Sequence, residues 1–237
     1  ITFTNDLNEV ISNTNIVFIA VAAKLIDSVS KDLSKLNIKN KHFCILSKGI
    51  EQNTCEFVID VFKRYVKTKN VSVISGPSFA IDMAKGEPVG LTIASKNNKT
   101  TLAIKRVLAS DTVKLRTSND IIGVELCGSI KNVIAIASGI LEGLGYTEST
   151  RSFLITESLH DIKSLIYGLG GKKKTILSYA GVGDLLLTAT SSKSRNYTYG
   201  ILIGKKNYTM AEDYLKNNTV EGYYTLKSIY TLIKRKK

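Results

Sequence analysis

The chain has 237 residues, of which 43% are apolar and 22% charged, and its formal net charge is +13. This length allows one or two domains with a sizeable core, and the composition excludes disorder as the main state. No run of about 18 uncharged apolar residues is present, so we expect no membrane span. Three cysteines without a CxxC motif exclude a disulfide framework, and two histidines without paired spacing predict no metal site.

The positive charge comes from 33 lysines and arginines against 20 acidic residues. A dedicated nucleic-acid binder clusters these cations on one face, with aromatic residues between them. Here the dense interior run is Lys172 to Lys174, which is typical of a solvated loop, and the abundance of Lys, Asn and Ile is consistent with codon bias. We therefore expect no nucleic-acid partner, and keep a basic binding module as an alternative of a different class.

The first half of the sequence alternates between two kinds of pattern. Short runs of apolar residues predict strands at residues 16–22, 42–47, 71–75, 89–94 and 112–116. Apolar residues at helical spacing predict helices at residues 25–36, 55–66, 78–85 and 99–109. Strands that alternate with helices at this spacing indicate an α/β fold, with a mostly parallel sheet covered by helices.

The pattern changes near residue 118, after which runs with a period of two vanish. Helical spacing predicts helices at residues 121–141, 153–167, 173–180, 184–190, 211–216 and 223–234. We therefore expect two domains: an α/β domain over residues 1–117, and an all-α domain over residues 118–237.

Lys131 lies in the middle of the predicted helix 121–141, which is apolar nearly all round. Such a helix is buried on every side. Burial disfavours an ammonium group and lowers the pKa of a lysine into the range where the lysine exchanges protons. Lys131 is therefore a candidate general acid or base. The alternative is a lysine whose stem is buried and whose amine reaches solvent or a carboxylate.

Other polar groups sit where ligands bind in α/β proteins. Lys48 follows the second strand, at the carboxyl end where open sheets bind ligands. Gly76, Pro77 and Ser78 form a turn between a strand and a helix, and such a helix start accepts anions. Asp184 begins a helix, and Arg195 follows several hydroxyl groups. An arginine with hydroxyls binds phosphate well, although the segment is also compatible with a polar surface loop.

These segments together resemble the NAD(P)-dependent glycerol-3-phosphate dehydrogenases of the bacterial type. The segments that carry the resemblance are Ser47–Glu51, Ser75–Ala80, Asp120–Glu125, Gly128–Gly139, Ala180–Leu185 with Thr188, Ser194–Asn196 and Val220–Gly222. Each is weak alone, but they occur in the family's order and at compatible spacing over nearly the whole chain. The resemblance implies a Rossmann-like first domain followed by a helical substrate-binding and catalytic domain.

The resemblance also implies an activity: interconversion of dihydroxyacetone phosphate and sn-glycerol 3-phosphate with NAD or NADP, which feeds glycerophospholipid synthesis. It implies a cytoplasmic homodimer. Lys131 matches the proton donor and acceptor. The other catalytic positions implied are Asp184, Lys48, Asn132 and Thr188. The substrate-binding positions implied are Lys48, Gly76, Ser78, Lys131, Asp184, Ser194, Arg195 and Asn196. The cofactor-binding positions implied are Lys48, Ala80, Arg195 and Glu221.

The sequence departs from the family pattern in three places. The strand–GxGxxG–helix unit that opens the family's dinucleotide fold is missing, together with a second strand, which amounts to about 60 residues. Residues 21–24 replace a turn that usually contains proline, and Thr219 stands where the family has an aliphatic residue. We therefore expect a chain truncated at the N-terminus and also short at the C-terminus. An inactive remnant of such an enzyme is the alternative.

Overall fold

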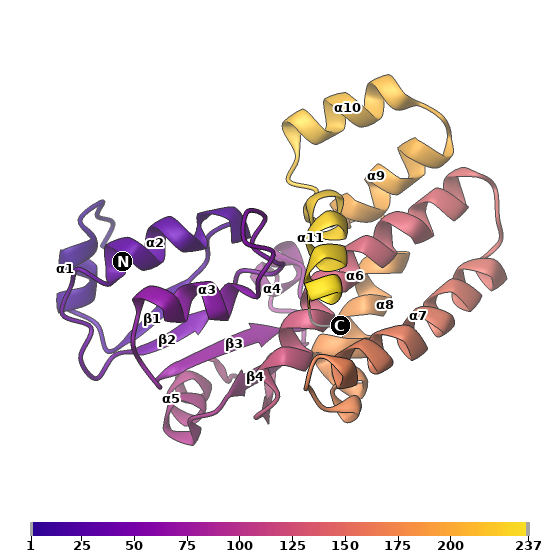
Figure 1. The fold of residues 1–237 in the computed structure, drawn as a ribbon. Helices are drawn as coiled ribbons and strands as arrows, with labels where there is room; N and C mark the ends of the chain where they lie inside the picture. The colour runs from indigo at the N-terminus through magenta and orange to yellow at the C-terminus, as the bar shows by residue number, and fades with distance from the viewer. Residues whose placement is uncertain (1, 236–237) are drawn as a thin grey trace.

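The computed structural model describes residues 2–235, and its first half is built around one five-stranded sheet (Figure 1). The strands lie side by side in chain order: β1 (Ile16–Ile19), β2 (His42–Ile45), β3 (Val71–Ser75), β4 (Val89–Ser95) and β5 (Val113–Ser118). Neighbouring strands are parallel except for β3 and β4, which are antiparallel. The predicted α/β class is confirmed, and the sheet is mixed.

Helices cover both faces of the sheet. Because side chains alternate along a strand, Phe43 and Ile45 of β2 join one apolar core while Cys44 joins a second core on the other face. The helices α2 (Ile26–Leu33) and α3 (Val58–Tyr65) pack in the first core, and α5 (Asn98–Leu108) packs in the second. Three short helices complete this half: α1 (Leu7–Ser12), η1 (Ala23–Leu25) and α4 (Ala80–Ala84).

Every regular element that the structure describes in the second half is a helix. Its elements are α6 (Ile121–Gly143), α7 (Glu148–Gly168), η2 (Lys173–Leu177), η3 (Tyr179–Gly183), α8 (Asp184–Thr190), α9 (Arg195–Gly204), α10 (Tyr208–Asn217) and α11 (Glu221–Arg235). Figure 1 shows α6 running from the sheet into the middle of these helices. The helical half thus begins directly after β5; that the two halves are separate domains stays a prediction.

The helix α6 forms the centre of this half. It is long and apolar enough, by length and composition, to cross a membrane, but 72% of its most apolar stretch is buried inside the protein. A core helix has this composition because it is surrounded by other elements. The predicted burial of α6 is thereby confirmed, since none of its residues is exposed.

The helix α9 is absent from the sequence-based prediction, and glycines account for its position. A Cβ atom on Gly200 would lie 2.2 Å from the carbonyl oxygen of Ile136, and one on Gly139 would lie 2.1 Å from that of Tyr197. Gly143 and Gly204 are packed in the same way. The backbones of α6 and α9 therefore touch, and this contact holds a segment whose own apolar spacing is irregular.

The predicted helix over residues 173–180 is also wrong in detail. A short 3-10 helix, η2, is followed by the wide turn η3, in which Gly181 has the non-helical angles φ −86° and ψ −109°. A Cβ atom on Gly181 would lie 2.1 Å from the carbonyl oxygen of Ile176. A glycine is therefore needed where the chain turns into α8, and this turn sets the position of Asp184.

Candidate active site

A buried ion pair joins the middle of α6 to the start of α8. Lys131 Nζ lies 2.6 Å from Asp184 Oδ1 and 3.0 Å from Thr188 Oγ1, and the three residues are 7%, 1% and 4% exposed. Thr188 lies one turn after Asp184, so its hydroxyl donates to the Asp184 carbonyl oxygen at 2.6 Å while it accepts from the lysine. The ammonium of Lys131 is therefore held by two oxygens in a largely dry position.

The second oxygen of the Asp184 carboxylate is bound from the sheet. Lys48 Nζ lies 3.1 Å and Ser75 Oγ lies 3.2 Å from Asp184 Oδ2. Lys48 follows β2 and Ser75 ends β3, so both reach Asp184 from the carboxyl ends of parallel strands. The Lys48 amine also lies 3.5 Å from the carbonyl oxygen of Gly76. One carboxylate thus joins the sheet to α6.

Burial and the two lysines determine the protonation of this pair. Burial, with the neighbouring charge of Lys48, lowers the pKa of Lys131 to about 8, against the opposing effect of Asp184. Burial also acts to raise the pKa of Asp184, but the charges of Lys48 and Lys131 and their hydrogen bonds outweigh it and leave that pKa below its usual value. Lys131 can therefore exchange a proton near neutral pH while Asp184 stays ionised.

A second hydrogen-bond network lies beside the pair. Asn196 Nδ2 donates to Asn132 Oδ1 at 3.1 Å, and Asn196 Oδ1 accepts from the backbone N–H of Gly222 at 2.9 Å. Asn132 Nδ2 lies 3.4 Å from Glu221 Oε2. Burial raises the pKa of Glu221 against the charges of Lys48, Arg195 and Lys131. The Asn196 side chain is thus committed to holding α6, α9 and α11 together.

A cavity of about 190 Å³ opens onto these groups. It is lined by Lys48, Ser78, Phe79, Lys131, Asn132, Asp184, Leu187, Thr188, Lys193, Ser194, Arg195, Asn196, Thr219 and Glu221. Ser194 and Arg195 stand at the start of α9, where Ser194 Oγ accepts from the backbone N–H of Tyr197 at 3.3 Å. Cations, hydroxyls and a helix start suit a small phosphorylated molecule.

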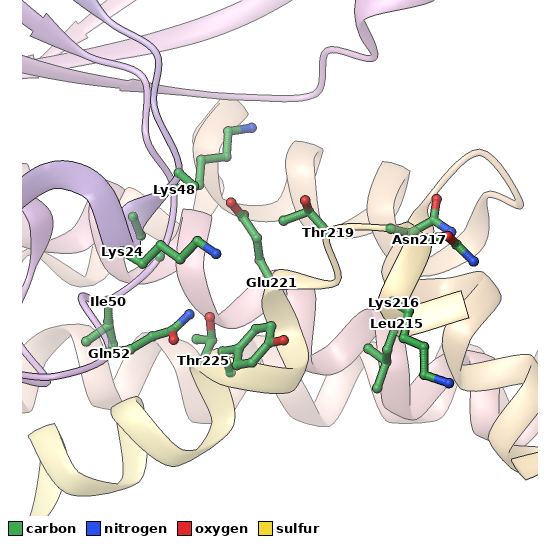
Figure 2. Close-up of a pocket in the computed structure, with 15 residues that line it drawn as sticks. Lys24, Lys48, Ile50, Gln52, Leu215, Lys216, Asn217, Thr219, Glu221 and Thr225 are labelled. Atoms are coloured by element: carbon green, nitrogen blue, oxygen red, sulfur yellow. The ribbon is translucent and has the colours of Figure 1, made fainter. Parts of the chain in front are cut away.

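A larger cavity, of about 510 Å³, adjoins the first and is lined in part by Lys24, Gln52, Tyr224 and Thr225 (Figure 2). Lys48, Thr219 and Glu221 line both cavities. Figure 2 shows the amine of Lys24 directed toward the carboxylate of Glu221, while the Lys48 side chain points away from both. The cavity lies beside the segments that follow β1 and β2, where doubly wound folds bind dinucleotides. Its residues therefore fit the nicotinamide end of NAD or NADP, next to the smaller cavity.

Most predicted site residues lie around these two cavities, and two do not line either. Gly76 contributes its carbonyl oxygen to Lys48 and Ser78, and a Cβ atom there would lie 2.5 Å from the carbonyl oxygen of Gly90. Ala80 begins α4 on the exposed surface. The sequence-based prediction gave no role to Ser75 or Lys193. The position of Ser75 as the last residue of a buried strand is the signal that could have identified it.

The comparisons with known proteins agree over nearly all of this chain. Residues 1–101 match the N-terminal part, and residues 120–237 the C-terminal part, of the NAD-dependent glycerol-3-phosphate dehydrogenases. The glycerol-3-phosphate dehydrogenase [NAD(P)+] of Staphylococcus epidermidis is 38% identical over 97% of this chain and 70% of its own length. That of Fusobacterium nucleatum is 37% identical over 98% of this chain and 70% of its own.

A solved structure gives the same result in three dimensions. The crystal structure of glycerol-3-phosphate dehydrogenase from Coxiella burnetii superposes with a TM-score of 0.89 at 30% identity, covering 97% of this chain and 70% of that one. The sequence matches and this superposition cover both the sheet and the helices, including the segments that hold Lys48, Lys131 and Asp184. The chain therefore belongs to the NAD-dependent glycerol-3-phosphate dehydrogenase family.

Proposed function

We propose that this chain interconverts dihydroxyacetone phosphate and sn-glycerol 3-phosphate, with NAD or NADP as the redox partner, and so feeds glycerophospholipid synthesis. The buried Lys131–Asp184 pair carries this proposal, because it lines a small cavity rich in anion-binding groups beside a larger cavity suited to a dinucleotide. The family membership supports the same reaction.

Lys131 is the proposed proton donor and acceptor. In the direction of reduction its ammonium gives a proton to the carbonyl oxygen of the substrate, which becomes the hydroxyl of the product; in oxidation the neutral amine takes that proton back. A pKa of about 8 leaves both forms accessible near neutral pH. Asp184 stays ionised and holds the amine, and Thr188 fixes its direction. We propose that Asn132, through its hydrogen bonds to Asn196 and Glu221, also helps to orient the groups around this amine.

The phosphate of the substrate is proposed to bind at the start of α9. Arg195 supplies a guanidinium that binds two phosphate oxygens at once, and Ser194 and Ser78 supply hydroxyls that line the same cavity. Asn196 holds this segment against α6 and α11 and has one amide hydrogen left for a ligand. Lys48 and the Gly76 carbonyl that it contacts complete the substrate side.

We propose that Lys48, Arg195 and Glu221 also hold the nicotinamide end of the cofactor, since Lys48 and Glu221 line both cavities. Ala80 is retained as a cofactor contact from the family resemblance alone. NADH or NADPH, when bound, supplies the hydride that goes to the carbonyl carbon. The site residues orient the carbonyl toward that hydride and exclude water from it, as the burial of Lys131 and Asp184 favours.

The test is oxidation of NADH or NADPH on addition of dihydroxyacetone phosphate, followed by loss of absorbance of the reduced cofactor. Unphosphorylated dihydroxyacetone serves as the control, because it keeps the carbonyl and lacks the anion. Oxidation that requires the phosphorylated substrate supports the proposal. Binding of substrate and cofactor without oxidation would instead support the inactive-remnant alternative, and a salt-sensitive complex with DNA without cofactor binding would support a nucleic-acid module.

We further propose that the chain works in the cytoplasm as a homodimer. Three large apolar side chains, Phe153, Tyr167 and Leu177, are 67%, 64% and 76% exposed on or near α7, and a second copy would cover them. Cys44, Cys55 and Cys127 are buried free thiols, which suits a reducing compartment. Light scattering during gel filtration measures the mass, and a monomer at micromolar concentration would contradict the dimer.

A further inference from the structure

Glu125 is a buried carboxyl group that the proposed mechanism does not use. It lies on α6, is 7% exposed, and its Oε1 accepts from the backbone N–H of Ile59 at 3.0 Å. Among the residues that the structure describes, none makes a hydrogen bond to its other oxygen, Oε2. Burying a carboxyl oxygen without a hydrogen-bond partner costs free energy, so we expect a partner for Oε2 at this point of the fold.

A small cavity of about 10 Å³ lies beside this carboxyl group. Its lining residues are Ser47, Lys48, Gly49, Val73, Ile74, Ser75, Val124, Glu125 and Gly128. That volume is about what one water molecule needs, and a water there has polar neighbours in Glu125 and Ser75. The cavity therefore suits one bridging water between these two side chains.

Ser75 connects this cavity to the proposed proton donor. A Cβ atom on Gly128 would lie 2.9 Å from Ser75 Oγ, so the serine hydroxyl rests directly against the glycine of α6. Glu125 lies three residues before Gly128 and Lys131 three residues after it, which places all three along one side of the helix. From there Ser75 Oγ donates to Asp184 Oδ2 at 3.2 Å.

We propose that Glu125 is a positioning residue of this site. Through one water molecule in the cavity that it shares with Ser75, it directs the Ser75 hydroxyl toward Asp184 and thereby changes the strength of the ion pair between Asp184 and Lys131. This inference rests on the proposed function, because it assigns the tuned lysine as the proton donor. It adds a residue that touches neither substrate nor cofactor.

The protonation of Glu125 sets the direction of this chain of hydrogen bonds. As a neutral acid it donates to the water, the water donates to Ser75, and Ser75 donates to Asp184. As a carboxylate it accepts from the water, and Ser75 turns to donate to the water instead. Burial raises the pKa of Glu125 to about 8, with Asp60 of α3 acting in the same sense and Lys63 of α3 opposing it.

Two other charged groups face this region, Lys48 at the cavity and Asp184 beyond Ser75. An ionised Glu125 adds a negative charge about 9 Å along α6 from Lys131, and it removes the hydrogen bond that Ser75 donates to Asp184. Both effects favour the ammonium form of Lys131. Lys131 therefore keeps its proton to a higher pH when Glu125 is free to ionise.

The first experiment is the pH dependence of kcat for reduction of dihydroxyacetone phosphate, in which loss of the Lys131 proton gives the alkaline limb. Glu125→Gln keeps an acceptor for Ile59 and a donor for the water but cannot ionise. We expect it to move the alkaline limb down by more than the roughly one pH unit that a charge about 9 Å away gives at an effective dielectric constant of about 20, because the hydrogen bonds through Ser75 add to the effect of the charge.

Two serine variants on β3 show whether the effect passes through the cavity. In a Ser75→Ala background, Glu125→Gln should move the limb by no more than the roughly one unit that comes from the charge alone, because the hydrogen-bond chain to Asp184 is already broken. Ser72→Ala is the matched control: Ser72 is buried on the same strand and donates to the carbonyl oxygen of Phe43. An equal shift in both backgrounds, or no shift on the wild-type background, overturns the inference.

An infrared measurement separates this inference from the proposed reaction. The wild-type chain near pH 7, without substrate, should show the carbonyl stretch of a protonated carboxyl group that is lost in Glu125→Gln. Ser75→Ala should move that band and Ser72→Ala should leave it in place. A band with this behaviour supports the inference even if no turnover is detected. A missing band, or one that Ser75→Ala does not move, overturns it even in an active enzyme.

Discussion

Asp184→Asn is the substitution that tests the proposed proton transfer most directly. The substitution keeps the size of the side chain, and residue 184 can still begin α8. It removes the negative charge that lies 2.6 Å from Lys131 Nζ. Lys131 would then be a buried ammonium beside Lys48 without its carboxylate partner. Such a group loses its proton more readily, so the pKa of Lys131 should fall below its present value of about 8.

The size of this effect follows from the contact that is lost. A hydrogen bond between charged groups contributes about 1.5–3 kcal/mol, which corresponds to about one to two pKa units. With a pKa of about 8, Lys131 is about three-quarters protonated at a pH near 7.5. With a pKa near 6.5, about one-tenth remains protonated. Loss of protonation alone should therefore reduce kcat for reduction about eightfold at that pH.

The assay is kcat for reduction of dihydroxyacetone phosphate between about pH 5.5 and pH 9. In Asp184→Asn the alkaline limb should move down by one to two units, and activity should recover in part toward low pH. Asp213→Asn is the control, because Asp213 is an exposed carboxylate that pairs with Lys216 on α10. An Asp184→Asn enzyme whose alkaline limb stays near pH 8 would refute the coupling of the two groups.

Three further substitutions have defined outcomes. Lys131→Met should lower kcat by about 10²- to 10⁴-fold in steady-state assays with little change in KM, because it removes the general acid; turnover near wild type would exclude that role. Arg195→Lys should raise KM for dihydroxyacetone phosphate about tenfold through loss of bidentate contacts with the phosphate, and more than it raises KM for the reduced cofactor; a KM for dihydroxyacetone phosphate near wild type would contradict phosphate binding there. Glu125→Gln should stabilise the chain increasingly as pH rises. In the folded chain Glu125 keeps its proton up to a pKa of about 8, whereas in the unfolded chain it loses the proton near pH 4.5. The free energy of unfolding of the wild type therefore falls as the pH rises through this window. In urea unfolding, the free energy of unfolding of Glu125→Gln should be close to that of the wild type at pH 4.5 and up to about 4 kcal/mol higher at pH 8. An increase that does not depend on pH would contradict a buried neutral acid.

The strands and the central helix could be predicted from the sequence because their signals are local. Short runs rich in apolar residues predicted β1 to β5, and the apolar run that includes Lys131 predicted α6 nearly to its ends. The direction of β4 could not be predicted this way. A strand buried on both faces has the same pattern in either orientation, so only the pairing of β4 with β3 shows that it runs antiparallel.

The residues of the site could be predicted from the sequence to different extents. A lone lysine in an apolar helix indicates an unusual environment, and this made Lys131 a candidate acid or base from physical reasoning, with a lysine whose amine reaches solvent or a carboxylate as the alternative; the family resemblance favoured the first. Local sequence indicated that Lys48 and Arg195 could bind ligands, but that they share one site with Asp184 depended on the family resemblance, because nothing in their local sequence brings three distant segments together. Ser75 and Glu125 lie in the segments that carry the resemblance, yet their contacts with Asp184 and with the small cavity are visible only in three dimensions.

The glycine contact between α6 and α9 has a consequence for how this enzyme's preference for substrates can change. The contact lies at Gly139 and Gly200, one to two turns along each helix from Asn132 and from Arg195. A methyl group added at Gly200 would collide with the backbone of α6, so α9, which begins at Arg195, would have to shift. Under the proposed role of Arg195, substitutions at these glycines alter how the substrate phosphate is bound although neither glycine lines the cavity.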